Sequence, residues 1–395
     1  MSLSMGTQGL GPSTLPPATE LLASLANIAQ RTDSTITNAG LLSVLLQGSK
    51  LPEVYVQPEQ DRPTNYPDVQ SELEVELPAV DLTAFNSLDG PARAEAMSKM
   101  VQACETWGFI QVINHGVDLD LTEKCEAEVH RLFQLPVSIK ENALRVPGAL
   151  YGYGANFWLN LPAMNWAESF HVTKHNCKEY AAKLWPSDYE RFSSSVEKYI
   201  AQVEDLGHRV RRILTEGLGL TPDYFDPYFT EKDTSSSLRM NFYPLCPEPS
   251  KALGLKAHRD PHFLTLLHQD ATGGLQIWNE RKDEWFNVKP RVDSFILNVG
   301  DVLQAASNGR YRSVLHRVVV NSYKTRLSMA CFFNTSATIV APPQLLTPEN
   351  PQRYRPFSWK EYIRTAYTVT TGKDSQLDEL YGIQENLPKQ REDQR

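Results

Sequence analysis

The chain has 395 residues, with 39 Lys and Arg against 47 Asp and Glu, which gives a net charge of −8. This mild acidity argues against a broad electrostatic role on nucleic acid or on an anionic membrane. Hydrophobic residues make up 41% of the chain, which is enough for a sizeable core and excludes disorder throughout. No run approaches the roughly 18 apolar residues of a membrane-spanning helix.

The five cysteines are scattered, odd in number and never spaced as CxxC. This pattern argues against a disulfide framework and against a zinc ribbon, so we expect a reducing compartment, the cytoplasm. Residues 1–40 contain few acidic and aromatic residues, and we expect a disordered extension there. A plastid-targeting peptide is the alternative for this segment.

Residues 41–235 are predicted to form a helix-rich N-terminal region. Apolar residues in steps of three and four predict helices, and short apolar runs that end at turn residues predict strands. The expected helices are 91–106, 119–134 and 187–217, and the expected strands are 77–82 and 109–114.

The pattern changes near residue 236, where short apolar runs follow one another closely. The expected strands are 239–243, 263–268, 274–278, 285–289, 293–299, 302–306, 314–320 and 326–333. Closely spaced short strands without intervening helices favour a sandwich or a jelly roll. The sequence therefore predicts an α+β fold with a β-rich core at 236–345, a C-terminal helical segment at 346–380 and a flexible tail at 381–395.

Two histidines and one aspartate stand out in the β-rich region. His258 and Asp260 are two positions apart, so on a strand both side chains would project from the same face. His316 lies in a later apolar run, with room for several strands between. Two histidines and one carboxylate on the inside of a β-barrel form the facial triad of non-haem Fe(II) oxygenases. Three protein ligands leave three positions of an octahedral iron free for a 2-oxo acid and O₂.

Arg326 and Ser328 follow His316 at a distance of about one hairpin and would share one strand face. A guanidinium binds a carboxylate bidentately, and a hydroxyl can add a further donor. The pair could therefore hold the distal carboxylate of 2-oxoglutarate. Upstream, Asn241 and Tyr243 alternate on a further strand and would also face inward.

A structural interpretation exists for each histidine alone, because buried histidines are often ordinary core residues. His262 shares the strand face of His258 and Asp260, and we expect packing or a contact with substrate rather than metal ligation. His115 precedes a glycine at a strand end, where a turn-anchoring role is expected, and His268 also ends a strand. The ordered combination of the triad with Arg326 and Ser328 favours the iron site.

Several stretches resemble the plant-type 2-oxoglutarate- and Fe(II)-dependent dioxygenases, which are relatives of isopenicillin N synthase. These stretches are residues 107–116, 241–247, 273–276, 298–301 and 307–317. The resemblance implies a double-stranded β-helix (jelly-roll) core with flanking N-terminal and C-terminal helices. It also implies Fe(II) as cofactor, 2-oxoglutarate and O₂ as co-substrates, and ascorbate as reductant.

The resemblance further implies roles for individual residues: iron on His258, Asp260 and His316, and 2-oxoglutarate on Arg326 and Ser328, with Tyr243 and Asn241 assisting. The chain departs from the family pattern at Arg259, where a small residue is common, and at Leu245. Neither departure touches an expected ligand.

The substrate is expected to be a small hydrophobic molecule, bound by a monomer that needs neither nucleic acid nor membrane. Residues 165–172, 184–186, 264–270 and 354–362 resemble the gibberellin oxidases, which makes a gibberellin-type diterpenoid acid the first candidate. Flavonoids or other specialised metabolites are the alternative, as is an iron oxidase that does not use 2-oxoglutarate. Arg239 and Lys256 are candidate partners for a substrate carboxylate. Five aromatic residues are candidates for the pocket wall: Phe157, Trp158, Phe170, Phe263 and Phe333.

Overall fold

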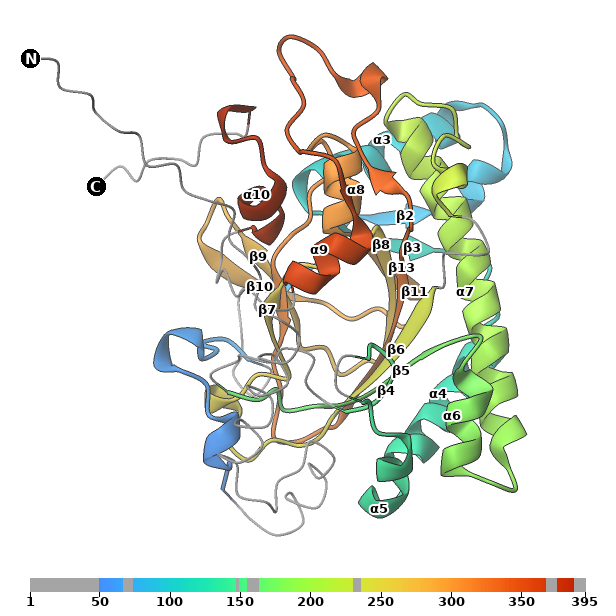
Figure 1. The fold of residues 1–395 in the computed structure, drawn as a ribbon, viewed down its shortest axis with the longest axis vertical. Coiled ribbons are helices and arrows are strands. Elements are labelled where there is room, and N and C mark those ends of the chain that lie inside the picture. Colours follow the sequence, from blue (N-terminus) through green and yellow to red (C-terminus); the bar gives the residue numbers. More distant parts are fainter. Residues whose placement is uncertain are drawn as a thin grey trace, which may run out of the picture. The chain divides into compact units, whose positions relative to one another are not determined.

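Two β-sheets form the centre of the fold in the computed structural model (Figure 1). The structure describes residues 50–66, 74–146, 149–154, 163–229, 236–366 and 375–386. The described residues all belong to one unit that spans Asn38–Arg395. The expected extension 1–40 and most of the expected tail 381–395 lie outside them.

The larger sheet has eight strands in the order β2-β3-β11-β8-β13-β6-β5-β4. Their bounds are β2 Ala79–Asp81, β3 Phe109–Ile113, β4 Gly152–Tyr153, β5 Glu168–Thr173, β6 Ser237–Tyr243, β8 Leu264–Gln269, β11 Ser294–Val299 and β13 Arg326–Phe333. Four of these strands, β2 to β5, come from the region that the sequence predicted to be helix-rich. β13 is buried along its whole length, because it lies between β8 and β6 with the cavity on one face and helices on the other.

The smaller sheet has five strands in the order β1-β10-β9-β12-β7. Their bounds are β1 Glu74–Val75, β7 Leu255–His258, β9 Leu275–Asn279, β10 Glu284–Val288 and β12 His316–Val318. A separate two-stranded sheet joins β14 (Thr338–Ile339) to β15 (Phe357–Ser358). The two main sheets form the expected jelly-roll core, so the predicted α+β class is confirmed.

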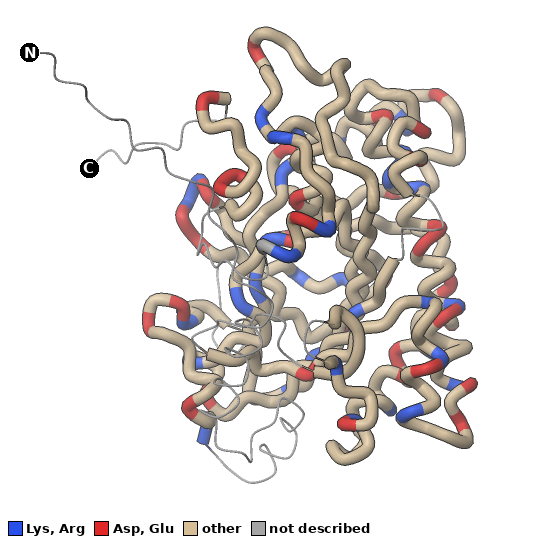
Figure 2. The backbone as a smooth tube through the Cα atoms, viewed as in Figure 1, with Lys and Arg blue, Asp and Glu red and all other residues tan. Residues whose placement is uncertain are grey.

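Helices lie outside the larger sheet, and α7 is the longest of those described (Figure 1). The bounds of the α-helices in the described residues are α3 Pro91–Thr106, α4 Leu119–Phe133, α5 Val137–Lys140, α6 Cys177–Leu184, α7 Tyr189–Gly217, α8 Asp301–Ala306, α9 Trp359–Ala366 and α10 Gln376–Tyr381. The sequence located α3, α4 and α7 to within two residues, because each carries one apolar stripe at helical spacing. Figure 2 shows basic and acidic positions interspersed along α7 rather than gathered by sign.

The close approach of α7 to the larger sheet depends on one glycine. A Cβ atom at Gly207 would lie 2.2 Å from the ring of Phe333 on β13, so only glycine fits there. Phe333 therefore points at the helix layer. No helix in the described part of the chain is long and apolar enough to cross a membrane.

One predicted strand, 302–306, is wrong: these residues form α8. β11 ends at Val299, and the backbone N–H groups of Asp301 and Val302 donate to the carbonyls of Asp260 and His262. A Cβ at Gly300 would lie 2.0 Å from the carbonyl oxygen of His262, so glycine permits this approach. The first turn of α8 thus supports the segment that carries Asp260.

Candidate active site

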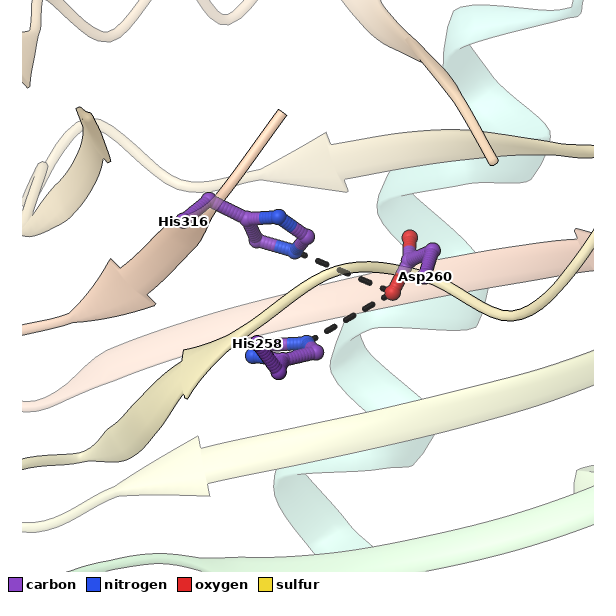
Figure 3. A group of neighbouring side chains, drawn as sticks. All are labelled: His258, Asp260 and His316. Atoms are coloured by element: carbon purple, nitrogen blue, oxygen red, sulfur yellow. Dashed lines mark ion pairs between the residues drawn. The ribbon is translucent and has the colours of Figure 1, made fainter. Parts of the chain in front are cut away.

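Three side chains that the sequence singled out meet between the two sheets (Figure 3). His258 is the last residue of β7 and His316 the first of β12, and the antiparallel pairing of these strands places them opposite each other. Asp260 lies two residues beyond the end of β7 rather than on the strand itself. The potential ligand atoms all lie within 4.8 Å of one another, and this is the one such group found among the described residues.

The two imidazoles point the same ring atom at the same carboxylate oxygen. Nε2 of His258 lies 3.5 Å from Oδ1 of Asp260, and Nε2 of His316 lies 3.7 Å from it. Nδ1 of His258 donates to the carbonyl of Lys256 at 2.8 Å, and Nδ1 of His316 donates to that of Val314 at 3.1 Å. Because a carbonyl only accepts, each Nδ1 carries a proton, and each Nε2 is the ring atom that faces Asp260, the arrangement found in metal-binding histidines.

Asp260 is oriented by two neighbours that the sequence analysis did not identify as site residues. Thr265 of β8 and Asn298 of β11 each donate to Oδ2 of Asp260 at 2.6 Å. Oδ1 is thereby left to face the two imidazoles. Asn298 belongs to the stretch 298–301 that carries the family resemblance, which was the available signal for its role.

The electrostatics of the three groups suit a divalent metal. Burial, with His258 adding to it, lowers the pKa of His316 to about 4, so this ring is neutral at pH 7. Burial on its own would raise the pKa of Asp260, but the facing His316 and His258 outweigh it and hold the pKa well below its usual range. Neutral imidazoles and one carboxylate are donors that Fe(II) accepts.

A cavity extends from these three side chains along β13 and β6. Arg326 and Ser328 line it from β13, and Tyr243 and Asn241 line it from β6. The strand register pairs Arg326 with Tyr243 and Ser328 with Asn241. Nδ2 of Asn241 donates to Oγ of Ser328 at 3.4 Å. The structure thus brings together all seven residues predicted for iron and 2-oxoglutarate.

Arg326 is a buried cation with only 3% of its surface exposed. Its Nη2 donates to Oε1 of Gln269 at 2.7 Å, and its guanidinium carbon lies 4.9 Å from the ring centroid of Tyr243. Nε and Nη1 have no hydrogen-bond partner among the described residues. Buried N–H groups of a cation without acceptors are costly, so this geometry fits a bound carboxylate.

The three described aromatic residues predicted for the pocket wall do not line the cavity. Phe170 pairs in register with Met240, on the face of the sheet opposite to Asn241, and its ring packs on Tyr180 and Phe192. The alternation of side chains along β13 determines which phenylalanine faces the cavity. Positions 326, 328 and 330 face it, so Phe332 lines the cavity and Phe333 does not.

Phe263 packs instead on Phe225 and Phe229, with ring centroids 5.6 and 5.0 Å apart. These contacts place it in the core behind the cavity. Phe157 and Trp158 lie outside the described residues. The phenylalanines of the cavity wall that the structure describes are Phe332 and Phe109, and Tyr243 adds a third aromatic ring.

His262 lies on the cavity wall, as the sequence allowed. Its ring stacks on Phe332 at 4.2 Å, and its Nδ1 lies 2.5 Å from Oδ1 of Asn334. The indole of Trp359, from α9, lies 6.0 Å from the His262 ring. His115 accepts a hydrogen bond from Val117 at its turn, and it is not among the cavity-lining residues.

The two candidate cations for a substrate carboxylate are placed differently. Arg239 lines the cavity from β6, opposite His171 of β5 in the strand register. Lys256 is instead 3.8 Å from the carboxylate of Asp61 and does not line the cavity. The structure therefore favours Arg239.

Comparison with known proteins agrees with this arrangement of side chains. Residues 234–335 match the family described as the 2OG-Fe(II) oxygenase superfamily, and residues 77–188 match the non-haem dioxygenase in morphine synthesis N-terminal family. The chain belongs to the 2OG-Fe(II) oxygenase superfamily. It is therefore a 2-oxoglutarate-dependent dioxygenase that uses Fe(II), and the alternative of an oxidase without 2-oxoglutarate is not retained.

Among its relatives, Jasmonate-induced oxygenase 2 of Arabidopsis thaliana is 36% identical over 326 residues, which cover 80% of this chain and 86% of the relative. Gibberellin 20 oxidase 1-A of Triticum aestivum is 35% identical over 331 residues, which cover 81% of this chain and 88% of the relative. The crystal structure of JOX2 in complex with 2OG, Fe and JA superimposes with a TM-score of 0.75 at 32% identity, covering 86% of this chain and 97% of that one. The predicted resemblance to plant-type dioxygenases is confirmed.

Proposed function

We propose that His258, Asp260 and His316 hold Fe(II), and that the chain oxidises a small apolar carboxylic acid with conversion of 2-oxoglutarate to succinate and CO₂. The observation that carries this proposal is the convergence of the three side chains and Arg326 on one cavity. When bound, Fe(II) supplies the activation of O₂ that the oxidation requires. The protein supplies the orientation: each ring and the carboxylate are fixed by the hydrogen bonds of Nδ1 and Oδ2.

Arg326 and Ser328 are proposed to bind the distal carboxylate of 2-oxoglutarate, with Tyr243 and Asn241 beside them. The support is the pair of buried guanidinium N–H groups, Nε and Nη1, without partners among the described residues. Gln269 holds the third nitrogen, so the fork is preorganised and loses little freedom on binding.

For the prime substrate we propose an apolar body against Phe332 and His262, with a carboxylate near Arg239. In the strand register Arg239 lies opposite Ala330, four positions along β13 from Arg326, and Phe332 lies beyond Ala330. A gibberellin-type diterpenoid acid remains the first candidate from the sequence, and the gibberellin 20 oxidase relatives support it. A JA-like acid is the second candidate, because the JOX2 structure that superimposes on this chain contains JA.

Mass spectrometry of a substrate panel tests this proposal. The purified protein is incubated with Fe(II), 2-oxoglutarate and one gibberellin precursor, jasmonate or flavanone at a time. We expect product mass shifts and succinate with one of the acids and none with the neutral flavanones. Turnover of flavanones alone would contradict the acid proposal. Arg239→Met should raise the KM of the acid about 10-fold or more and leave that of 2-oxoglutarate unchanged.

A further inference from the structure

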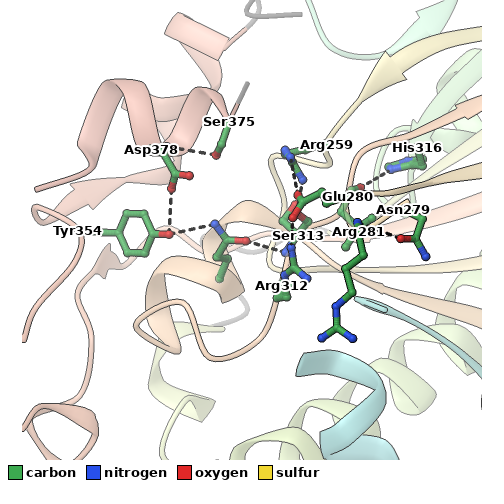
Figure 4. Close-up of polar contacts among 12 residues, drawn as sticks. Arg259, Asn279, Glu280, Arg281, Arg312, Ser313, His316, Tyr354, Ser375 and Asp378 are labelled. Carbon is green, nitrogen blue, oxygen red and sulfur yellow. Dashed lines mark hydrogen bonds and ion pairs between the residues drawn. The ribbon is translucent and has the colours of Figure 1, made fainter. Parts of the chain in front are cut away.

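Arg259 lies between two of the proposed iron ligands in the sequence, and its guanidinium contacts Ser313 and Glu280 (Figure 4). Side chains alternate along an extended segment, so a residue between His258 and Asp260 faces the opposite way. Its Nη1 donates to the carbonyl of Ser313 at 2.5 Å, and its Nη2 lies 3.5 Å from Oε1 of Glu280. Arg259 is mostly buried, with 13% of its side chain exposed, so these contacts are partly shielded from water.

The Ser313 contact joins the two segments that carry the proposed iron ligands. Ser313 lies three residues before His316 and next to Val314, the residue whose carbonyl orients the His316 ring. The β7–β12 ladder pairs His258 with His316, and its register shifts between His316 and Val318. The Arg259–Ser313 hydrogen bond is thus a further link between the two segments, in addition to the ladder.

The peptide groups of Ser313 are held on both sides. Its N–H donates to Oε1 of Gln304 in α8 at 2.7 Å, while its carbonyl accepts from Arg259. Nε2 of Gln304 in turn donates to the hydroxyl of Tyr354 at 3.0 Å, and that hydroxyl donates to Oδ1 of Asp378 in α10 at 3.0 Å. A continuous chain of hydrogen bonds therefore runs from α10 to Arg259 (Figure 4).

From this geometry we propose that Arg259 is a positioning residue. It fixes the distance between the His258–Asp260 segment and the His316 segment, and through Ser313 and Gln304 it makes that distance depend on the docking of α10. The inference rests on the proposed assignment of the three iron ligands. A small residue at position 259 would have no group that reaches Ser313, so the link is a property of this chain rather than of the shared ligand motif.

Co(II) substitution without oxygen tests the proposal, because its visible absorption reports the geometry of its ligands and needs no turnover. We compare the wild-type protein with Arg259→Met, Arg259→Lys and Arg312→Met. Arg312→Met is the matched control: Arg312 also pairs with Glu280, but its guanidinium has no contact with the Ser313 carbonyl in the described residues. Melting temperatures are measured on the metal-free proteins.

We expect Arg259→Met to bind Co(II) about 10-fold more weakly, with an altered visible spectrum. That change equals roughly 1.4 kcal/mol. Arg259→Lys, which keeps a donor near Ser313, should recover part of the affinity and of the spectrum, and Arg312→Met should match the wild type. Tyr354→Phe, which cuts the chain between Gln304 and Asp378, should shift the spectrum in the same direction. This variant still tests the proposal if Arg259→Met does not fold.

A wild-type spectrum and affinity in both Arg259→Met and Tyr354→Phe, whatever their melting temperatures, would overturn the positioning role. An equal loss in Arg312→Met would overturn it as well, since the loss would then come from Glu280 alone. Failure of the wild-type protein to bind Co(II) would instead overturn the proposed iron site, so the two failures are distinguishable.

Discussion

At the scale of single residues, the clearest test of 2-oxoglutarate binding is Arg326→Lys. Lysine keeps the charge but loses the planar fork, and a hydrogen bond to a charged group contributes about 1.5–3 kcal/mol. We expect the KM for 2-oxoglutarate to rise about 10- to 150-fold and the KM for the prime substrate to change little. Arg239→Lys is the matched control, because it alters the other cavity arginine and should give the reverse pattern. An unchanged 2-oxoglutarate KM in Arg326→Lys would exclude the proposed contact.

The proposed iron ligands make a second prediction at this scale. Asp260→Ala and His316→Ala should each abolish turnover, because two side chains cannot hold Fe(II) in a defined facial geometry. His268→Ala is the control, since this buried histidine of β8 lies 3.4 Å from Glu126 and does not line the cavity. Fe(II) retention by dialysis and product formation are measured together. Wild-type turnover by Asp260→Ala would contradict the assignment.

Site residues could be predicted from the sequence where both the residue type and its spacing pointed to the same role. The triad, Arg326 and Ser328 could be predicted because the chemistry of each position requires a particular residue type. The spacing of two residues within 258–260 and within 326–328 also predicts a shared strand face for each pair. The aromatic wall could not, since a phenylalanine is equally at home in core and cavity. The alternation of side chains along β13 could nevertheless have identified the right phenylalanine. The strand face that contains residues 326 and 328 also contains Phe332, whereas Phe333 lies on the opposite face.

At the scale of elements, α9 lies at the cavity through the contact of Trp359 with His262. We propose that α9 covers the bound substrate, and Trp359 is the residue at which this can be tested. We expect Trp359→Ala to retain Fe(II) and 2-oxoglutarate binding while the ratio of succinate to oxidised product rises. A poorly covered substrate escapes oxidation more often, although 2-oxoglutarate is still converted to succinate. The control is Lys360→Ala, at the exposed neighbouring position. An unchanged ratio of succinate to oxidised product would show that α9 does not cover the substrate.

The attachment of α9 makes a separate prediction. The hydroxyl of Tyr362 donates at 2.6 Å to Oδ2 of Asp301, a buried carboxylate in the first turn of α8. Tyr362→Phe leaves that oxygen without its donor and should lower the free energy of unfolding by about 1–3 kcal/mol. Tyr381→Phe is the control, since the Tyr381 hydroxyl makes no hydrogen bond with the described residues. Equal denaturant midpoints for the two variants would refute this anchoring contact.

The elements themselves were predictable where the hydrophobic period was long. α7 could be located from its stripe, whereas α8 was predicted as a strand because six residues are too few to distinguish the two periods. Tertiary contacts make residues 301–306 helical, because the N–H groups of the first turn donate to the carbonyls of the 260–262 segment. Those partners are distant in the sequence, so the pattern of 301–306 alone carried no sign of them.

At the scale of the whole molecule, the β-rich core was predicted but its completion was not. β2 and β3 match the predicted strands 77–82 and 109–114, but β4 and β5, which extend the larger sheet from the N-terminal region, were not predicted, because short strands among strong helices give a weak signal. The sheets are held by apolar burial rather than by metal. We therefore expect chelation with EDTA to abolish turnover, leave the circular dichroism spectrum unchanged and be reversed by Fe(II). Unfolding on chelation would show that the metal is needed for the fold.

We propose that one cavity couples 2-oxoglutarate to the oxidation of an acidic substrate through His258, Asp260, His316 and Arg326. The most direct measurement is succinate formed per oxidised product, in wild type and in Asp260→Ala, with and without the best acid of the panel. We predict a ratio near one for wild type with substrate, little succinate without substrate, and none from Asp260→Ala. Succinate formation by Asp260→Ala at the wild-type rate, or oxidised product without succinate, would contradict this coupling.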